Sequence, residues 1–293
     1  MEKQISMYLM NKKGYSVLLS FIEKFGSAPI NCVIIARDKN MEADYYEEIK
    51  KLCEKYFIKV FDRKDAPVIE SSFSFAIGWR WIIAGTSKLI VFHDSLLPAY
   101  RGFAPLVSSL IKNEKKLGVT ALFASKEYDK GEIIAQSSFN VQYPIKIAEA
   151  IELISGCYIS LVNEITEKII KNVKIESSLQ KENESTYSLW RDEEDYLIDW
   201  NEDAISIQRF INSTSHPYKG ASSFINEKKI RILDSEIVED VKIEIRQVGK
   251  VIFIEDGYPV VVCGKGLIKL LSIKDDSSKL DMLPLQNFRV RFK

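Results

Sequence analysis

The feature that most constrains the fold is an alternation, in the first third of the chain, of short apolar runs with stretches of helical periodicity. Strands that are apolar along their whole length are typical of parallel sheets that helices cover on both faces. The pattern predicts an α/β fold built on a doubly wound, mainly parallel sheet. The expected strands are residues 5–9, 32–36, 59–61, 73–77 and 89–92, and the expected helices are residues 15–25 and 44–56.

The middle of the chain continues the same kind of pattern. Residues 105–112 predict a helix with proline in its first turn, and residues 118–124 and 133–141 predict two more strands. Apolar residues recur at helical spacing over 147–169. This stretch predicts a long helix that can cover the sheet.

The composition changes at residues 177–185, which are polar and rich in charge, as is typical of a linker. Beyond them, the sequence predicts one short helix (204–211) and then five short strands divided by turns. We therefore expect three regions: a Rossmann-like domain over 1–176, a linker or crossover over 177–203, and a smaller, mainly β (OB-like) domain over 204–293.

The charge balance limits the classes of partner. The 41 Lys and Arg residues are matched by 41 Asp and Glu residues, so the 293-residue chain has a formal net charge of zero. The chain therefore lacks a global positive field that could collect a polyanion by counterion release. A dedicated nucleic-acid binder is disfavoured.

The cysteines and the amino terminus indicate a location inside the cell. The four cysteines are widely spaced and form no CxxC pair, so we expect buried thiols in a reducing compartment. With two histidines and no cysteine cluster, we expect no metal site. We see no signal peptide and no apolar run of membrane-spanning length. The sequence predicts a cytoplasmic protein without a membrane partner. The four cysteines are Cys32, Cys53, Cys157 and Cys263.

His93 directly follows the predicted strand 89–92, at the edge where an open α/β sheet presents its functional residues. Asp129 begins the turn Asp129-Lys130-Gly131 between two later strands. A carboxylate beside an imidazole orients it and stabilises its charged form, which is useful for acid/base chemistry. Taken alone the pair is weak, because a single histidine is structural more often than catalytic.

The sequence motifs around His93 and Asp129 indicate a function more specifically than the two residues do alone. HDSLLPAYRG at residues 93–102, GVT at 118–120, DKG at 129–131 and Gln136 together resemble the signature of the folate-dependent formyltransferases. In that family the motif HxSLLPxYRG carries the catalytic histidine and a later DxG carries the catalytic aspartate. The resemblance implies that His93 and Asp129 have these roles.

The resemblance extends beyond the predicted linker. DYLIDW at residues 195–200 and PYKGA at 217–221 are similar to the second domain of the two-domain members. A single-domain enzyme that formylates glycinamide ribonucleotide would end before these words. The chain therefore resembles a two-domain formyltransferase.

The resemblance also implies a cofactor, 10-formyltetrahydrofolate. In the family, its pterin lies near the carboxyl edge of the sheet and is held largely by backbone groups of two segments. In this chain those segments are residues 80–83 and 123–129. The cofactor-binding residues would include Arg80, Trp81, Ile82, Ile83, Tyr128 and Asp129. For Trp79 and Trp81, an aromatic core is an equally weighted alternative.

Two-domain members include methionyl-tRNA formyltransferase and the enzymes that formylate nucleotide-linked amino sugars. The tRNA enzymes resemble one another in a basic insertion in the first domain, whereas the basic runs of this chain's first domain are short, Lys12-Lys13 and Lys115-Lys116 among them. We interpret the chain as an N-formyltransferase for the amine of a nucleotide-activated amino sugar, in cell-surface glycan synthesis. A homodimer is compatible with this interpretation. The alternatives are methionyl-tRNA formyltransferase and a catalytically silent protein that binds folate or a nucleotide sugar.

Arg101, directly after the catalytic motif's tyrosine, is our candidate for a substrate-binding cation that faces the diphosphate. An ion pair that stabilises the loop is the equally weighted alternative.

The chain departs from the family at Val91. The family usually has asparagine two residues before the histidine, on the same face of the strand, where its amide can donate to an oxyanion. Valine cannot donate, and loss of one such donor typically lowers turnover by about 100-fold to 1000-fold. Either a backbone amide near Asp94 or Ser95 replaces the amide, or the enzyme is slow, or catalysis is lost. We favour the first explanation, because both His93 and Asp129 are present.

Overall fold

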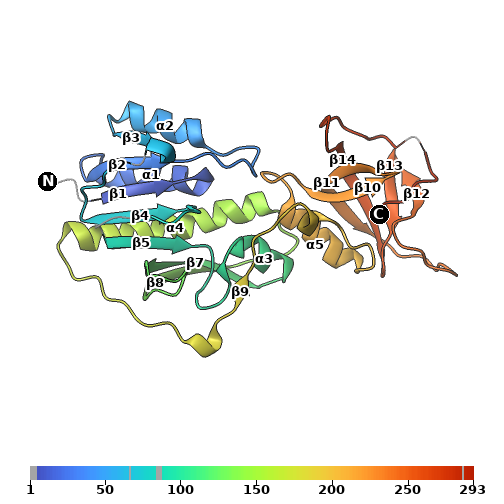
Figure 1. Cartoon of the computed structure of the whole chain (residues 1–293). Coiled ribbons are helices and arrows are strands. Elements are labelled where there is room, and N and C mark those ends of the chain that lie inside the picture. Colours follow the sequence, from blue (N-terminus) through green and yellow to red (C-terminus); the bar gives the residue numbers. More distant parts are fainter. Residues whose placement is uncertain (1–4, 66, 84–87, 286) are drawn as a thin grey trace. The chain divides into compact units, whose positions relative to one another are not determined.

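The computed structural model describes residues 5–65, 67–83, 88–285 and 287–293. The chain folds into two compact units (Figure 1). The first unit comprises Met1–Leu106, Lys115–Val141 and Ala150–Leu189, and the second comprises Val107–Glu114, Gln142–Glu149 and Trp190–Lys293. Residues 177–189, in the segment expected to be a linker, lie in the first unit.

The first unit is built on a sheet whose described strands have the order β3-β2-β1-β4-β5-β7-β8. The first five are parallel, because helices or long connections return the chain to the same edge. β7 and β8 are antiparallel to their neighbours, which makes the sheet mixed. The strands are β1 (Ile5–Leu9), β2 (Ile30–Ile35), β3 (Val60–Asp62), β4 (Phe73–Ile77), β5 (Lys88–His93), β7 (Lys116–Phe123) and β8 (Ile133–Asn140).

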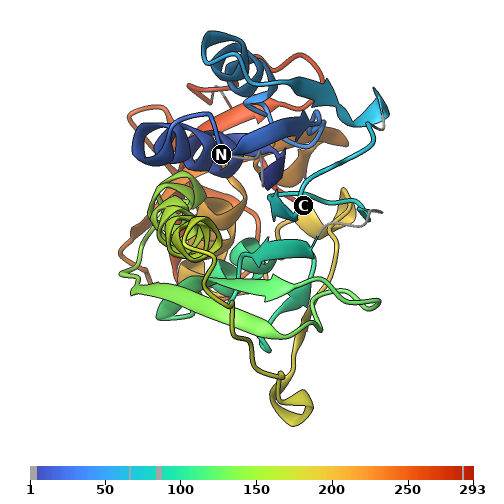
Figure 2. The same cartoon turned by 90° about the vertical axis from the view of Figure 1, so that its left-hand side faces the viewer.

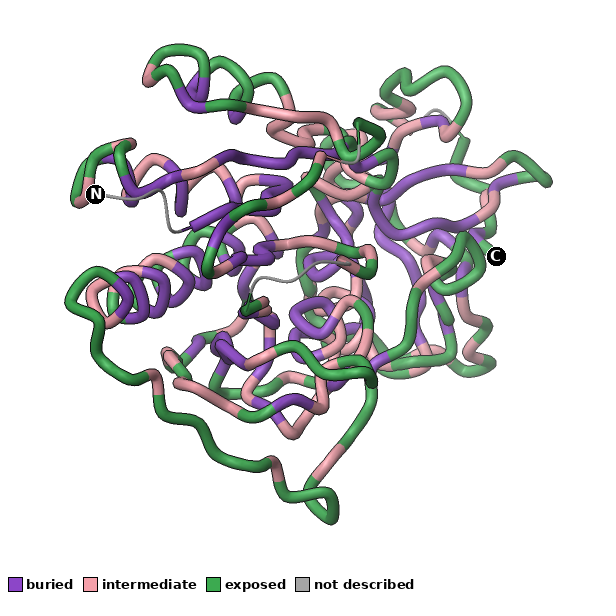
Figure 3. Tube along the Cα trace, turned by 60° about the vertical axis from the view of Figure 1, so that its left-hand side comes forward, coloured by how far each residue is buried: buried purple, intermediate pink, exposed green. Residues whose placement is uncertain are grey.

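One face of this sheet is covered by α1 (Asn11–Phe25) and by the part of α4 (Ile147–Ile170) that belongs to the unit (Figure 2). The two helices are joined by an ion pair between Lys24 and Glu167. α4 buries the apolar positions that its periodicity predicted, and Figure 3 shows the buried stripe along it. A further helix of this unit is α2 (Tyr46–Lys55), which follows β2.

The opposite face carries a smaller cluster of buried side chains that includes Tyr8, Ile34 and Ala76. Trp79 and Val91 are partly buried and pack against it. Because side chains alternate along a strand, His93 lies on the same face as Val91. Phe92 points to the helical face, where its ring contacts other aromatic rings.

The second unit contains α5 (Ala204–Thr214) and an antiparallel sheet of order β10-β11-β14-β13-β12 among the described residues. Asp203 caps α5, since its carboxylate accepts the N–H of Ser206 at 2.8 Å. Trp200, Ile207 and Ile211 pack into the core of this unit. The strands are β10 (Ala221–Ile225), β11 (Lys228–Val238), β12 (Val251–Glu255), β13 (Tyr258–Val262) and β14 (Leu267–Asp275).

The chain also contains several short helical and strand elements between the longer ones. Figure 1 places β9 beside the loop that follows β5, and β9 pairs in parallel with β6, so that Arg101 lies opposite Tyr187. The short elements are η1 (Arg63–Asp65), β6 (Arg101–Gly102), α3 (Pro105–Ile111), η2 (Glu182–Glu184), β9 (Tyr187–Ser188) and η3 (Glu194–Tyr196).

The predicted fold class is confirmed: a Rossmann-like α/β sheet is followed by a smaller antiparallel β unit. All four cysteines are buried, as expected. Among the described residues, no helix combines the length and the hydropathy that a membrane crossing requires. The sequence did not reveal that β7 and β8 are antiparallel.

The aromatic core of the first unit provides a test of the fold. Phe75 is fully buried and packs edge-on against Phe92 at a ring distance of 5.6 Å, whereas Phe57 is 94% exposed. We expect Phe75→Ala to lower the free energy of unfolding by about 3–5 kcal/mol, because it removes buried area and leaves a cavity. Phe57→Ala is the matched control and should change it by less than about 0.5 kcal/mol. Urea denaturation followed by circular dichroism measures both, and similar losses in the two variants would contradict the assigned core.

Candidate active site

His93 ends β5 at the carboxyl edge of the sheet and is only 8% exposed. Its Nε2 lies 2.8 Å from the carbonyl oxygen of Tyr100. A carbonyl can only accept, so Nε2 carries the proton that it donates, and this bond assigns the tautomer. In the neutral ring, Nδ1 is therefore the basic nitrogen.

Asp129 lies in the turn between β7 and β8, in a left-handed backbone conformation with φ of 55°. Its Oδ1 is 3.5 Å from Nδ1 of His93, and its Oδ2 accepts the backbone N–H of Gly102 at 2.9 Å. The structure thus brings together the two residues that the sequence predicted as a pair. A proton that reaches Nδ1 faces a carboxylate held in place from its other side.

Side chains on the neighbouring strands β7 and β8 hold the loop between β5 and β6 through hydrogen bonds. Thr120 on β7 donates to the carbonyl of Ser95 at 2.7 Å and accepts the N–H of Leu97 at 3.0 Å. Gln136 on β8 donates to the carbonyl of Leu97 at 2.8 Å. Thr120 of the GVT motif and Gln136 therefore fix the conformation of the loop that follows His93.

Arg101 is 1% exposed, and its guanidinium is paired with two residues far along the chain. It forms a bidentate pair with Glu182, both contacts at 2.9 Å, and donates to Oε1 of Gln180. The amide nitrogen of Gln180 in turn donates to the carbonyls of Asp129 and Gly131 at 2.7 and 2.8 Å. This arrangement corresponds to the ion-pair alternative: Arg101 fixes residues 180–182, which in turn support the turn that carries Asp129.

Two glycines permit this close packing. A Cβ atom at Gly102 would lie 2.5 Å from the carbonyl oxygen of Ser188, and its φ of 102° already disfavours other residues. A Cβ atom at Gly131 would lie 1.7 Å from the carbonyl oxygen of Phe123. Both positions therefore require glycine.

The residues expected to hold the cofactor precede His93 or lie next to Asp129 in the sequence, and their side chains differ in exposure. Arg80 is exposed and pairs with Asp38, and Ile82 and Tyr128 are 78% and 66% exposed. Ile83 is partly buried in the cluster that contains Val91, and Trp79 joins the same cluster, as the aromatic-core alternative supposed. Trp81 instead lines a cavity.

The backbone of both segments suits a heterocyclic ligand. Within the described residues, the N–H and C=O groups of residues 80–83 and 125–128 form no hydrogen bond to another backbone group, although the C=O of Glu127 accepts the hydroxyl of Ser125 at 2.6 Å. A pterin ring presents donors and acceptors along its edge, so free backbone groups of this kind fit it. The second expected segment was 123–129, and at its ends Phe123, Ala124 and Asp129 already use a backbone group in a hydrogen bond.

Because Val91 has no side-chain amide, a backbone N–H must donate to the oxyanion instead, and the structure distinguishes the two candidates. The N–H of Ser95 donates to the carbonyl of His93 at 2.8 Å and so is already engaged. The N–H of Asp94 forms no hydrogen bond among the residues that the structure describes. Of the two backbone amides considered from the sequence, that of Asp94 is the one left free.

The sequence did not reveal a buried charge network behind His93. The carboxylate of Asp94 is bound by the ammonium of Lys13 and by the hydroxyl of Tyr158 on α4. Burial opposes ionisation of Asp94, but Lys13 and both hydrogen bonds outweigh it and lower its pKa. Burial and the Asp94 charge raise the pKa of Tyr158 well above its ordinary value. Asp94 is therefore a carboxylate that ties α1, β5 and α4 together.

Other chemistries find little support among the described residues. No group of three or more His, Cys, Asp or Glu side chains there could hold a metal ion. Burial raises the pKa of Cys53 and of Cys263 to about 12, so neither thiol is a nucleophile at neutral pH.

Comparison with known proteins finds two family models and several relatives that match this chain. A family model described as "Formyl transferase" matches residues 40–151, and one described as "Formyl transferase, C-terminal domain" matches residues 191–287. Methionyl-tRNA formyltransferase from Syntrophomonas wolfei is 28% identical over 187 residues, which are 64% of this chain and 59% of that protein. The chain thus spans about three-fifths of the length of this relative.

One further relative and one solved structure match more of the chain. The bifunctional polymyxin resistance protein ArnA from Wigglesworthia glossinidia brevipalpis is 30% identical over 249 residues, 80% of this chain and 38% of that protein. The crystal structure of the N-formyltransferase from Helicobacter canadensis with folinic acid and dTDP-3-aminofucose has a TM-score of 0.66 at 20% identity. The match covers 92% of this chain and 99% of that one.

The charge network behind His93 predicts a pH-dependent contribution to stability. Asp94→Asn should lower the free energy of unfolding at pH 7 by about 3 kcal/mol, because Lys13 then lacks its buried counter-charge. Since the pKa of Asp94 is lowered in the folded state, its contribution is full above the ordinary value of 3.8 and is lost as the pH falls below it. The difference between wild type and variant should therefore shrink in acid.

Urea denaturation at a series of pH values measures this difference, with the exposed Glu23→Gln as the matched control. A loss that does not depend on pH, or no loss at pH 7, would contradict the assigned network.

Proposed function

Because this chain belongs to the formyl transferase family, we propose that it transfers the formyl group of 10-formyltetrahydrofolate to the amine of a nucleotide-linked amino sugar. The observation that carries the proposal is the contact between Nδ1 of His93 and Oδ1 of Asp129, at 3.5 Å on the carboxyl edge of the sheet. An imidazole with a free basic nitrogen and an adjacent carboxylate is suited to taking a proton from an attacking amine.

When bound, 10-formyltetrahydrofolate supplies an electrophilic formyl carbon. Residues 80–83 and 125–128, which lie within the expected segments 80–83 and 123–129, would hold its pterin through backbone groups that have no backbone partner. Holding both reactants beside His93 replaces a bimolecular encounter by a positioned one.

His93 then moves one proton. Its Nδ1 accepts the proton that the amine loses as the new C–N bond forms, while Nε2 keeps its bond to the carbonyl of Tyr100. Asp129 stabilises the imidazolium, because its Oδ1 faces the protonated Nδ1. His93 would then give this proton to the folate nitrogen as the bond between that nitrogen and the formyl carbon breaks, so that tetrahydrofolate leaves and His93 is neutral again. The backbone N–H of Asp94 is our candidate for the donor that stabilises the oxyanion in place of the missing amide at Val91.

Two observations favour a nucleotide-linked amino sugar as the acceptor. The chain has no net charge, whereas an enzyme that holds tRNA benefits from a positive surface. The Helicobacter canadensis enzyme, whose structure contains dTDP-3-aminofucose, corresponds to this chain over nearly the whole length of both. The same proposal includes a cytoplasmic enzyme of cell-surface glycan synthesis that has no nucleic-acid or membrane partner, and it leaves room for a homodimer.

A second candidate is methionyl-tRNA formyltransferase, which the match to the Syntrophomonas wolfei protein favours. An assay with 10-formyltetrahydrofolate and either dTDP- or UDP-linked amino sugars or charged initiator tRNA separates the two candidates. Formylated sugar without formyl-methionyl-tRNA is the expected result, and the reverse would replace our proposal.

The assigned pair predicts the effect of two substitutions. His93→Asn and Asp129→Asn should each lower the rate of formyl transfer by about 100-fold to 10,000-fold, because each removes a part of the proton-transfer machinery. The second histidine of the chain provides the matched control, since His216 lies in the second unit. His216→Asn should retain the wild-type rate. Unchanged rates in both site variants would exclude these roles.

A further inference from the structure

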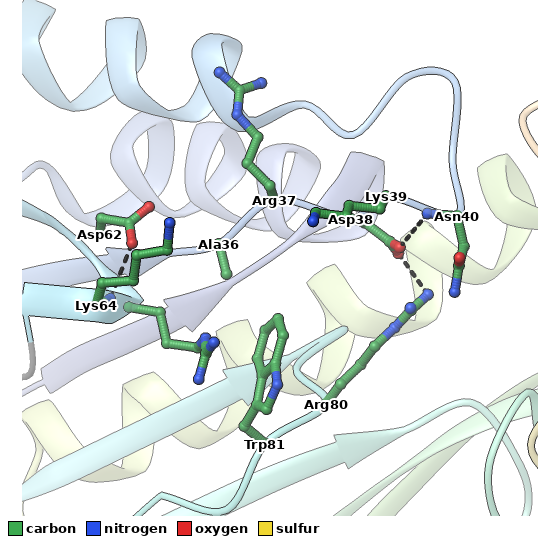
Figure 4. A pocket seen from close by; sticks show the side chains of 10 residues that line it. Ala36, Arg37, Asp38, Lys39, Asn40, Asp62, Lys64, Arg80 and Trp81 are labelled. Carbon is green, nitrogen blue, oxygen red and sulfur yellow. Dashed lines mark hydrogen bonds and ion pairs between the residues drawn. The ribbon is translucent and has the colours of Figure 1, made fainter.

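A cavity of about 440 Å³ lies at the carboxyl ends of β2, β3 and β4 (Figure 4). It is lined by residues 36–40 after β2, residues 62–64 at the end of β3, and Arg80 and Trp81 after β4. All three segments belong to the first unit. The cavity is large enough for a small ligand and lies on the same edge of the sheet as His93.

The lining carries an excess of positive charge. Five cationic side chains line the cavity, against the two carboxylates of Asp38 and Asp62. Asp38 is already bound by Arg80 at 2.5 Å, by Asn11 at 3.3 Å and by the N–H of Asn40 at 3.1 Å. Asp62 accepts the Tyr46 hydroxyl at 2.8 Å and the N–H of Lys64 at 2.9 Å. The cations are Arg37, Lys39, Arg63, Lys64 and Arg80.

Three of these cations form no ion pair among the described residues, although the charges of Arg63 and Lys64 also act on Asp62 and help to lower its pKa. Arg37 pairs with carboxylates on the loop and helix that follow it, and Arg80 pairs with Asp38. Lys39, Arg63 and Lys64 form no ion pair with any carboxylate among the described residues. A cavity that gathers unpaired cations from two adjacent loops favours an anion.

Two cations are also held in place. Arg80 is fixed by the buried carboxylate of Asp38, as Figure 4 shows. The guanidinium of Arg63 lies 4.2 Å from the centre of the Trp81 ring, a cation–π contact. Positioning of this kind lowers the entropy lost when the side chains close on a ligand.

We propose that this cavity binds the phosphate groups of a nucleotide, and that Lys39, Arg63 and Lys64 are the side chains that contact them. A diphosphate concentrates two to three negative charges on adjacent groups, and guanidinium and ammonium groups match it in charge and hydrogen bonding. The identification of this nucleotide with the activating group of the acceptor sugar rests on the proposed function. These cations, rather than the buried Arg101, would then face the diphosphate.

Isothermal titration with dTDP, UDP and inorganic pyrophosphate tests the proposal directly. Wild type should bind dTDP or UDP, and pyrophosphate more weakly, with affinity that falls as salt is added. The double variant Arg63→Ala/Lys64→Ala should bind the nucleotide and pyrophosphate about 100-fold more weakly, at roughly tenfold for each lost contact. Lys39→Ala should give about a tenfold loss. Lys51→Ala, on the exposed side of α2, is the matched control and should leave affinity unchanged.

A parallel titration with folinic acid separates two anionic ligands, since a folate also carries glutamate carboxylates. Weaker nucleotide and pyrophosphate binding with unchanged folinic acid binding supports the proposal. Loss of folinic acid binding with unchanged nucleotide binding overturns it, and so does absence of nucleotide binding by the wild type. Thermal unfolding by circular dichroism establishes that the variants are folded.

The formyl-transfer assay keeps this proposal distinct from the function on which it rests. If wild type formylates no amino sugar but the variants lose nucleotide and pyrophosphate binding, the cavity is still a phosphate site and only the proposed function fails. If wild type formylates a nucleotide-linked amino sugar and the variants bind nucleotide normally, the cavity proposal fails alone.

Discussion

The carboxylate of Asp129 is the point on which the geometry of the candidate site depends. One of its oxygens faces His93 and the other accepts the N–H of Gly102, so a single side chain joins the turn after β7 to the loop after β5. Each partner reaches this position for a separate reason: β5 delivers His93 to the sheet edge, and Gly131 lets the turn approach β7 closely. The site is therefore an outcome of sheet pairing rather than of one loop alone.

The sequence predicted the pair because its residues lie in motifs that resemble those of the formyltransferases. Local structure alone, with His93 after an apolar strand and Asp129 in a turn, was weak evidence for it. The charge network could not be found in this way. Lys13, Asp94 and Tyr158 come from three distant segments, and only the packing of α1 and α4 on the sheet brings them together.

Arg101 shows a second limit of sequence reasoning. A basic residue in a motif can face a ligand or a buried carboxylate, and its own neighbours do not distinguish the two. Its partners, Gln180 and Glu182, lie about 80 residues further along, in a stretch whose polar composition suggests a solvated linker. The polar composition correctly predicts that this stretch is exposed, but it does not reveal the contact with Arg101. The antiparallel pairing of β7 and β8 was missed for a related reason, since apolar strands look alike in either direction.

The contact between residues 180–182 and Arg101 also determines where the first unit can be cut. A chain that ended at residue 176 would retain every strand of the large sheet, together with His93 and Asp129. It would nevertheless remove Gln180 and Glu182, which pair with the guanidinium of Arg101, and leave the carbonyls of Asp129 and Gly131 without their donor. The turn that carries Asp129 would then lose the support of residues 180–182. A piece of this unit that keeps the turn of Asp129 supported therefore extends to about residue 189, where β9 has completed its pairing with β6.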